Sequence, residues 1–332
     1  MKKFFLVVII ILVLSTTLCG CQLSTNPTGF AMGTFYDISL ENGSVSSEEV
    51  QEILDKIDNL FSLSNQSSEL SRFNNLEKNL SFTLGKETLF LYNRALELYS
   101  QTNGAFNPFI YPLIELWGFT PPFNQLANHV IPTSSQINYL LPLCDSNNFV
   151  LVGNSLTKLN DGCKLDFGAI AKGYAVDQLR SYLLDKNKTA LINVGGNLAS
   201  VGKDYTIGLA SPRESEFTYL LSFQLKDGYT CSTSGDYEKY FTIDGQRYCH
   251  ILDKNGYPVN NGVMSVSIIH KDGLMADALS TAVMVMGLEE GLKFCKNNGI
   301  SAIIVTSNNQ IHTSNIDVTL KDTNYFINEQ KA

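Results

Sequence analysis

The sequence is short of basic residues. Its 24 lysines and arginines stand against 32 aspartates and glutamates, which gives a formal net charge of −8 over 332 residues. Because binding to nucleic-acid phosphates requires a basic surface, we expect no nucleic-acid partner. The 44% of hydrophobic residues can still build a large core. We therefore expect one large folded domain or two closely joined lobes.

Cysteine is also sparse, and its spacing carries no metal-binding motif. Two of the seven cysteines, Cys19 and Cys21, lie near the N-terminus, and no Cys-x-x-Cys pair occurs anywhere. Neither a zinc site nor a dense disulfide framework is predicted. One bridge, between Cys231 and Cys249, is left open for a protein outside the cytoplasm.

Three common nucleotide-binding and hydrolase motifs are missing. The segment from Gly196 to Lys203 has five residues before its Gly-Lys pair and no Ser or Thr after it, so it is not a phosphate-binding P-loop. No G-x-G-x-x-G and no G-x-S-x-G occurs. These absences disfavour a Rossmann dehydrogenase and an α/β-hydrolase.

The N-terminal hydrophobic run is too short to span a membrane. Lys2 and Lys3 precede an apolar stretch from Phe4 to Leu14, followed by small and polar residues, which is typical of a secretory leader. Leu18-Cys19-Gly20-Cys21 resembles the lipobox of bacterial lipoproteins and implies cleavage after residue 20 and acylation of Cys21. The alternative is an ordinary cleaved leader with a chance cysteine.

This pattern predicts three segments: a lipoprotein signal peptide at residues 1–20, a tether at 21–29 and a folded domain at 30–325. The tether is polar and contains Pro27. An acylated Cys21 would place the protein at the cell membrane, lipid-anchored on the extracytoplasmic or periplasmic side.

Hydrophobic periodicity predicts an α+β fold with mixed, largely antiparallel sheets and flanking helices, because strands come in runs with helices between the runs. Ser46 and Glu49 form a capping-box pattern before the first helix, whereas residues 64–75 and 120–135 show no periodicity and are expected as loops. Helices are expected at residues 50–61, 86–101, 171–184, 275–286 and 288–297, and strands at 35–40, 190–194, 205–209, 219–225, 263–269 and 302–305.

Two stretches carry the most informative chemistry. In Lys164–Asp177, a buried strand end at Leu165 and Phe167 is expected to lead through Gly168 into a helix, with Asp166 and Lys172 beside the junction. Free N–H groups in a helix's first turn favour a bound anion.

In Met275–Gly287, Asp277 and Thr281 are four residues apart on an apolar helix, so their oxygens share one face and can hold a hard cation. The alternative for this pair is an N-terminal helix charge and a hydroxyl bonded back to its own helix.

A histidine stands out near the end of a predicted hairpin. Only four histidines occur, and His250 follows a turn at Asp244-Gly245 and is set among polar residues. A neutral imidazole can take a proton from an attacking hydroxyl near physiological pH, which makes His250 the natural general base. The alternative is a structural histidine in a hairpin.

Nine sequence blocks in order resemble the ApbE family of FAD:protein FMN transferases, from about Phe30 to Ser307. They are AMGT (Ala31–Thr34), SELSRFN (Ser68–Asn74), GAFNP (Gly104–Pro108), LWGF (Leu116–Phe119), LDFGAIAKGYAVD (Leu165–Asp177), INVGGN (Ile192–Asn197), STSGDYEKYF (Ser232–Phe241), HILD (His250–Asp253) and ADALSTA (Ala276–Ala282).

The resemblance implies a T-fold-like architecture and Mg²⁺-dependent transfer of FMN from FAD to a Ser or Thr hydroxyl of a target protein, releasing AMP. Mn²⁺ could replace Mg²⁺. The acceptors would be flavoprotein subunits of membrane or exported redox systems. FAD hydrolysis to FMN and AMP, and a non-catalytic flavin-binding lipoprotein, are the alternatives.

The resemblance also implies residue roles. His250 matches the proposed base, and the metal ligands would be Ala169, through its carbonyl, with Asp277 and Thr281. Flavin and adenine contacts would fall on Met32, Ala105, Phe106, Asn107, Asp166, Lys172 and Ile251. The sequence departs from the family pattern at Asn107, where an acidic residue is common, and at Lys254-Asn255, which replace a Pro and a Thr.

The segment from Asp227 to Thr233 loosely resembles the acceptor sequence of these enzymes, with Thr233 in the acceptor place. Since the segment overlaps the STSG block, self-modification is not expected.

Overall fold

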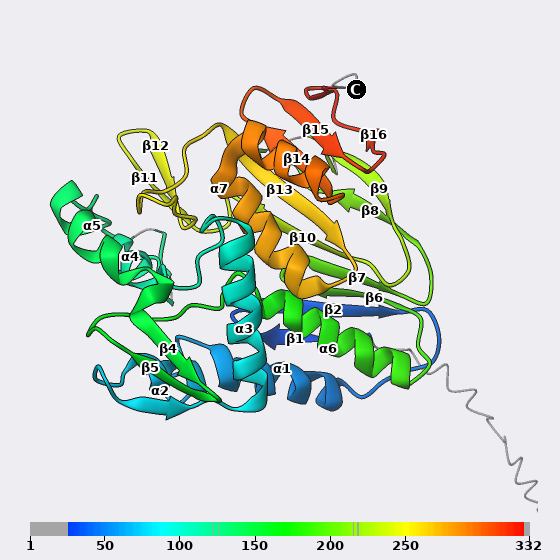
Figure 1. Ribbon diagram of the computed structural model, residues 1–332. Coiled ribbons are helices and arrows are strands. Elements are labelled where there is room, and N and C mark those ends of the chain that lie inside the picture. Colours follow the sequence, from blue (N-terminus) through cyan, green and yellow to red (C-terminus); the bar gives the residue numbers. More distant parts are fainter. Residues whose placement is uncertain (1–25, 122, 126, 215, 218, 329–332) are drawn as a thin grey trace, which may run out of the picture.

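The computed structural model describes residues 26–121, 123–125, 127–214, 216–217 and 219–328 (Figure 1). The expected signal peptide and the expected acylation site, Cys21, lie outside the described residues. Within the described ranges, no helix combines the length and the apolar character needed to cross a membrane.

The core of the fold is a nine-stranded sheet in the order β1-β2-β6-β7-β10-β13-β14-β15-β17. Every neighbouring pair in it is antiparallel except β15 and β17. Its strands are β1 (Thr28–Ala31), β2 (Thr34–Leu40), β6 (Ala190–Val194), β7 (Asn197–Val201), β10 (Thr230–Gly235), β13 (Val263–His270), β14 (Ser301–Thr306), β15 (Gln310–Ser314) and β17 (Phe326–Ile327). The predicted largely antiparallel α+β fold is confirmed.

Two helices cover one face of this sheet, α6 (Ala171–Asp185) and α7 (Gly273–Asn297) (Figure 1). The first half of α7 is buried almost all round, which suits a helix between a sheet and other helices. Beside them lie α1 (Ser47–Phe61) and α3 (Lys86–Gln101). The helices and this sheet face enclose the main hydrophobic core.

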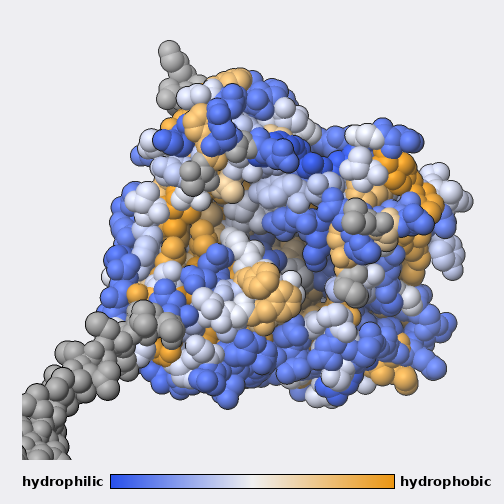
Figure 2. Space-filling model, turned by 180° about the vertical axis from the view of Figure 1, so that it is seen from behind, coloured by the Kyte–Doolittle hydropathy of each residue, from blue (hydrophilic) through white to orange (hydrophobic). Residues whose placement is uncertain are grey.

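The other face of the sheet packs against a small sheet, β16-β9-β8, through a second apolar cluster that includes Ile207, Phe223 and Ile303. The strands of this small sheet are β8 (Tyr205–Leu209), β9 (Leu221–Leu225) and β16 (Thr319–Leu320). In the view from behind (Figure 2), hydrophilic side chains dominate the surface, hydrophobic ones gather in separate patches, and the face is hollowed near its middle.

The remaining elements lie to one side of the main sheet (Figure 1). A hairpin of β11 (Tyr240–Ile243) and β12 (Gln246–Cys249) packs with two short helices through an aromatic cluster around Trp117. The other elements are α2 (Glu69–Asn74), β3 (Ser81–Thr83), α4 (Tyr111–Trp117), α5 (Ser134–Leu140), the short 3-10 helices Leu141–Leu143 and Ser146–Asn148, β4 (Phe149–Val152) and β5 (Ser155–Lys158).

Several predictions about local structure are wrong in instructive ways. The expected loop at residues 64–75 contains α2, whose Ser68 cap accepts a hydrogen bond from the Ser71 N–H. Leu165 and Phe167 are buried as expected, but they belong to no strand. Ser46 caps α1, whereas Glu49 does not complete a capping box because its carboxylate binds Tyr182 and Lys186 instead.

The boundaries of the folded part also differ from expectation. β1 begins at Thr28, inside the expected tether, and the Pro27 carbonyl accepts a hydrogen bond from the Ile38 N–H. At the other end, β17 (Phe326–Ile327) lies entirely beyond the expected boundary at residue 325. The two helices expected at 275–286 and 288–297 form α7, with a kink at Gly287, whose φ is 79°.

The bridge left open between Cys231 and Cys249 is not formed. The cysteines within the described residues are all free and buried, Cys231 in the second apolar cluster and Cys249 in the main core. They act as small apolar side chains.

Candidate active site

The site is built where α6 and α7 touch. A Cβ atom added at Gly173 would lie 2.1 Å from the Gly273 carbonyl oxygen and 2.8 Å from the Asp277 Cβ. Only glycine permits this approach of two helix backbones. The close contact carries the Asp277 carboxylate to the first turn of α6, where its Oδ2 accepts a hydrogen bond of 2.9 Å from the Gly173 N–H.

The contact is reciprocal. Asp177 of α6 accepts hydrogen bonds from the Gly273 N–H at 2.8 Å and the Leu274 N–H at 3.3 Å, in the first turn of α7. Its Oδ1 also accepts a bond from Arg180. Each helix thus uses a carboxylate from the other to satisfy N–H groups that have no partner within their own helix. This exchange fixes the position of both helices.

The Asp277 side chain is buried, and its second oxygen makes a long ion pair with Lys172. Oδ1 lies 3.9 Å from the Lys172 ammonium, beyond hydrogen-bonding range. Burial raises the pKa of Asp277, while Lys172 and the Gly173 N–H act to lower it. Asp277 in turn raises the pKa of Lys172.

Thr281 lies one helical turn after Asp277, as the sequence predicts. Its hydroxyl is 3.1 Å from the Ser234 hydroxyl, which also contacts Ser280 at 2.7 Å. Ser234 comes from β10, so the α7 face that bears Asp277 and Thr281 is tied to the end of that strand. The alternative for Thr281, a hydroxyl bonded back to its own helix, is not observed among the described contacts.

The oxygens near this crossing fit a hard divalent cation. The Ala169 carbonyl accepts no hydrogen bond from any described residue, because the Gly173 N–H that would reach it in a regular helix turns to Asp277 instead. One carboxylate, one hydroxyl and one carbonyl resemble the sparse oxygen set that Mg²⁺ takes. The described residues contain no group of three or more His, Cys, Asp or Glu that could hold a metal.

The loop before α6 is held by hydrogen bonds to residues that are distant in the sequence. The Asn74 carboxamide donates to the Leu165 carbonyl and accepts from the Leu165 N–H, both at 2.8 Å, which replaces a neighbouring strand. Asp166 then bonds the Gly168 N–H at 2.7 Å, and its own N–H donates to the Pro108 carbonyl. Asp166 is thereby fixed between the GAFNP turn and the start of α6.

Charged side chains converge beside this loop. Lys172 interacts with Asp166, Asp277 and Glu238, and its ammonium donates to the Gly168 carbonyl at 3.3 Å. Lys239 faces the same group: burial and then Lys172 lower its pKa. Two ammonium groups near one another, with carboxylates around them, form a polar site that can receive a polyanion.

His250 lies at the end of β12 and belongs to this group. Its backbone N–H donates to the Lys239 carbonyl at 2.9 Å, and its Nδ1 is 3.2 Å from the same oxygen. Burial, followed by Lys239 and Lys172, lowers the pKa of His250 to about 3. The imidazole is therefore neutral at physiological pH, as a general base must be.

The residues expected to contact flavin and adenine lie in several parts of the fold. Asp166 and Lys172 lie in the polar site, and Ile251 follows His250, although its side chain is buried. Met32 lies at the tip of the β1–β2 turn with φ 52°, and the neighbouring Thr34 packs against Gly195.

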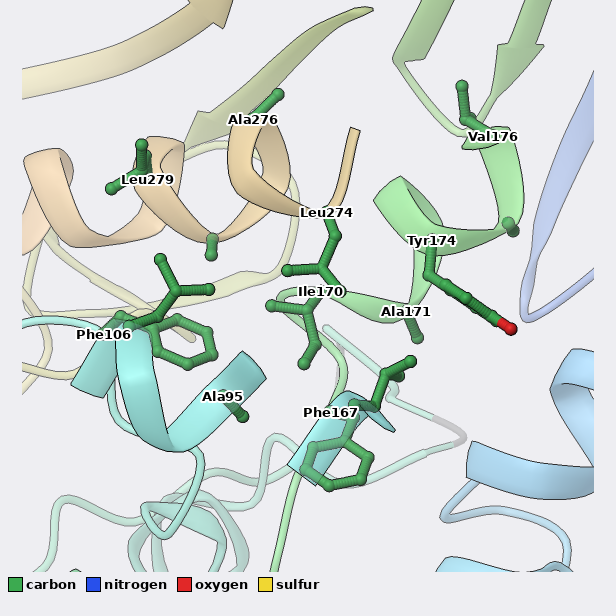
Figure 3. Packing of buried hydrophobic residues seen from close by; sticks show 14 of the residues in the cluster. Ala95, Phe106, Phe167, Ile170, Ala171, Tyr174, Val176, Leu274, Ala276 and Leu279 are labelled. Carbon is green, nitrogen blue, oxygen red and sulfur yellow. The ribbon is translucent and has the colours of Figure 1, made fainter. Parts of the chain in front are cut away.

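The side chains of the GAFNP turn make contacts within the protein. Ala105 and Phe106 are buried in the main core, and Figure 3 shows the Phe106 ring on the same side of α7 as the apolar side chains of Leu274 and Ile170. Asn107 donates to the Cys144 carbonyl and accepts from the Phe109 N–H, so its carboxamide is already engaged. Contacts of these residues with a flavin stay predictions.

Sequence reasoning missed Ser234, Glu238, Lys239 and Asn74 as site residues. The first three belong to the STSGDYEKYF block, whose run of polar residues was the one feature of the sequence that could have indicated site residues there. Asn74 gave no local signal, because its partner lies 91 positions later in the chain.

The fold and the site together define an α+β domain with a phosphate-compatible polar site, a candidate hard-cation site and a neutral histidine. Comparison with protein families matches residues 32–304 to the ApbE family. A FAD:protein FMN transferase of Vibrio cholerae is 30% identical over 304 residues, covering 87% of this chain and 90% of the relative.

Two solved structures are similar as well. The ApbE protein of Thermotoga maritima superimposes with a TM-score of 0.79 at 34% identity, covering 87% of this chain and 96% of that one. The flavinyl transferase ApbE of Pseudomonas stutzeri, in its apo form, gives a TM-score of 0.74 at 31% identity, covering 89% and 93%. The chain belongs to the ApbE family.

Proposed function

We propose that this protein is an enzyme that transfers FMN from FAD to a Ser or Thr hydroxyl of an acceptor protein, with Mg²⁺ bound at Ala169, Asp277 and Thr281. Membership of the ApbE family and the similarity to a relative named FAD:protein FMN transferase support the overall reaction. The finer chemistry rests on the arrangement of this chain's own side chains.

In the proposed reaction, the acceptor hydroxyl oxygen attacks the phosphorus of the FMN half of FAD. The new O–P bond forms as the P–O bond to the AMP half breaks, and AMP leaves with the electron pair. His250 takes the hydroxyl proton on its free ring nitrogen. Lys172 and Lys239 face the diphosphate and offset its charge.

The observation that carries the proposal is the placement of Asp277. One of its oxygens is fixed by the Gly173 N–H, the other makes only a 3.9 Å ion pair with Lys172, and Thr281 lies one turn away. A divalent cation held by Ala169, Asp277 and Thr281 would supply positive charge beside the diphosphate. Mn²⁺ could take the same oxygen ligands.

The test uses the purified full chain in detergent, with FAD, Mg²⁺ and an apo acceptor subunit of an exported or membrane redox system. Flavin fluorescence on a denaturing gel is expected on the acceptor, with one AMP released per flavin attached. Asp277→Asn and His250→Ala should lose the signal, and the matched control Asp204→Asn, at the surface ion pair with Lys226, should keep it.

The same assay separates the alternatives. Free FMN and AMP without a labelled acceptor would mean FAD hydrolysis, with water in place of the protein hydroxyl. Flavin binding with no turnover would mean a flavin-binding lipoprotein, a function that requires neither the cation site nor a base.

We also propose that acylation of Cys21 anchors the protein on the extracytoplasmic or periplasmic side of the cell membrane, near its acceptor proteins. The lipobox-like Leu18–Cys21 supports this. Cells fed labelled palmitate should label the wild type but not Cys21→Ser, and an unlabelled wild type would refute the anchor.

A further inference from the structure

Two arginines hold one aspartate at the exit of β10. Asp236 accepts hydrogen bonds from Arg213 on both oxygens, at 2.8 and 2.7 Å, and from Arg247 on Oδ1 at 3.2 Å. The side chain of Asp236 is only 17% exposed. A two-oxygen bond to a guanidinium fixes both distance and plane, so the carboxylate has little freedom.

This cluster joins three separate parts of the chain. Arg213 lies in the connection between β8 and β9, Asp236 follows β10, and Arg247 lies on β12, where its guanidinium stacks 4.1 Å from the Tyr240 ring centroid. The Asp236 N–H also donates to the Met264 carbonyl of β13. The segment from Asp236 to Tyr240 is therefore anchored at both of its ends.

Lys239, one residue before the end of this anchored segment, contacts His250. The Lys239 carbonyl lies 3.2 Å from the His250 Nδ1. Because a carbonyl oxygen can only accept, a hydrogen bond there requires the proton on Nδ1 and leaves Nε2 bare. A neutral imidazole has two tautomers, and only the one with a bare Nε2 can take a proton at that atom.

We propose that Asp236, held by Arg213 and Arg247, is a positioning residue that keeps the Lys239 carbonyl against His250 Nδ1 and so presents Nε2 as the proton acceptor. The inference rests on the proposed function, because it takes His250 as the base. During transfer, the acceptor hydroxyl proton moves to Nε2, and the resulting imidazolium keeps its Nδ1–H on the Lys239 carbonyl until it releases the new proton to water.

The main test compares the full chain with its Asp236→Asn variant in the FMN-transfer assay. Displacement of the base by about 1 Å is enough to lower kcat by roughly tenfold to a hundredfold. KM for FAD should stay within about twofold, because Asp236 has no expected contact with FAD. Asp204→Asn is the matched control and should leave kcat and KM unchanged.

A double variant separates positioning from general support of the fold. If Asp236 acts through His250, Asp236→Asn should cost nothing further in a His250→Ala background. An equal loss of kcat in both backgrounds would overturn the inference while leaving the base role intact. Full activity of His250→Ala would instead refute the base role, and with it the proposed mechanism.

Nitrogen NMR of the histidines gives a readout that does not depend on residual turnover. The wild type should show His250 with a protonated Nδ1 and a bare Nε2, and Asp236→Asn should show mixed tautomers. A single Nε2–H tautomer in the wild type would overturn the inference. If Asp236→Asn does not fold, Arg247→Met replaces it, because this variant keeps both hydrogen bonds from Arg213 to Asp236. It should give the same changes in tautomer and kcat, but smaller ones. Unchanged spectra and an unchanged kcat in a folded Arg247→Met variant would overturn the inference.

Discussion

Replacement of Gly173 by alanine tests the helix crossing on which the site depends. The added Cβ would lie 2.1 Å from the Gly273 carbonyl oxygen, whereas real Cβ contacts stay above 3.0 Å, so the two backbones must separate by at least about 0.9 Å. The 2.9 Å bond from the Gly173 N–H to Asp277 would then lengthen to about 3.8 Å, which is no longer a hydrogen bond. The variant therefore removes the fixed position of Asp277 without changing Asp277 itself.

Two costs add in this variant. Overpacking of a well-filled contact costs about 1–3 kcal/mol, and loss of a hydrogen bond to a charged group costs about 1.5–3 kcal/mol. Together they predict a fall of roughly 2.5–6 kcal/mol in the free energy of unfolding, measured by urea denaturation of the purified chain. FMN transfer should fall by at least about a hundredfold, with a higher Mg²⁺ concentration for half-maximal rate.

Gly153→Ala is the control, because a Cβ at Gly153 meets nothing within 4 Å, although Gly153, unlike the helical Gly173, has a positive φ of 62°. It should cost only about 1–2 kcal/mol for the left-handed backbone and leave transfer intact. If Gly173→Ala keeps both the stability and the Mg²⁺ dependence of the wild type, the helix crossing does not position Asp277 and the reasoning fails.

Three further outcomes follow from the same geometry. The pKa of His250 is lowered to about 3, so the imidazole becomes protonated only when the pH falls far below 6.5. The pH profile of kcat/KM for FAD should therefore show no loss of activity centred near pH 6.5. Such a loss would contradict the assignment of His250 as the neutral base. Asp277→Asn removes a charged cation ligand and should raise the Mg²⁺ requirement at least about tenfold, and an unchanged requirement would exclude Asp277 as a ligand. Asn74→Ala leaves the Leu165 N–H and carbonyl unpaired inside the protein and should lower the free energy of unfolding by about 2–5 kcal/mol in urea titrations. A free energy of unfolding equal to that of the wild type within experimental error would show that water replaces the amide.

Local patterns predicted those elements whose ends are marked in the sequence. The helix Lys86–Gln101 was predictable at both ends because Gly85 and Gly104 flank an amphipathic run. The turn at Asp244-Gly245 was predictable because an Asp-Gly pair favours the two-residue hairpin turn that requires positive φ at both positions. Both residues do adopt positive φ in the hairpin. The spacing of Asp277 and Thr281 correctly put two oxygens on one helical face.

Features that depend on distant partners were out of reach. Leu165 resembles a strand residue because it is buried, but its backbone N–H and carbonyl are satisfied by Asn74 rather than by a neighbouring strand. Glu49 has the right spacing for a capping box, but Tyr182 and Lys186 compete for its carboxylate. In both cases a tertiary contact overrides a local rule.

The position of Thr233 in strand β10 bears on whether the enzyme can attach FMN to itself. Thr233, in the acceptor place of the segment Asp227–Thr233, lies within β10 opposite Ser267, and the two hydroxyls are 2.7 Å apart. To meet a flavin phosphate, Thr233 would have to leave the ladder between β10 and β13, and its neighbour Ser234 would have to leave Thr281 at the proposed cation site.

Self-modification would therefore dismantle the site that performs it. Incubation of the full chain with FAD and Mg²⁺ should leave its intact mass without an FMN increment, while an acceptor subunit in the same tube gains one. An increment that disappears in Thr233→Val would show that β10 opens far more readily than its paired hydrogen bonds allow.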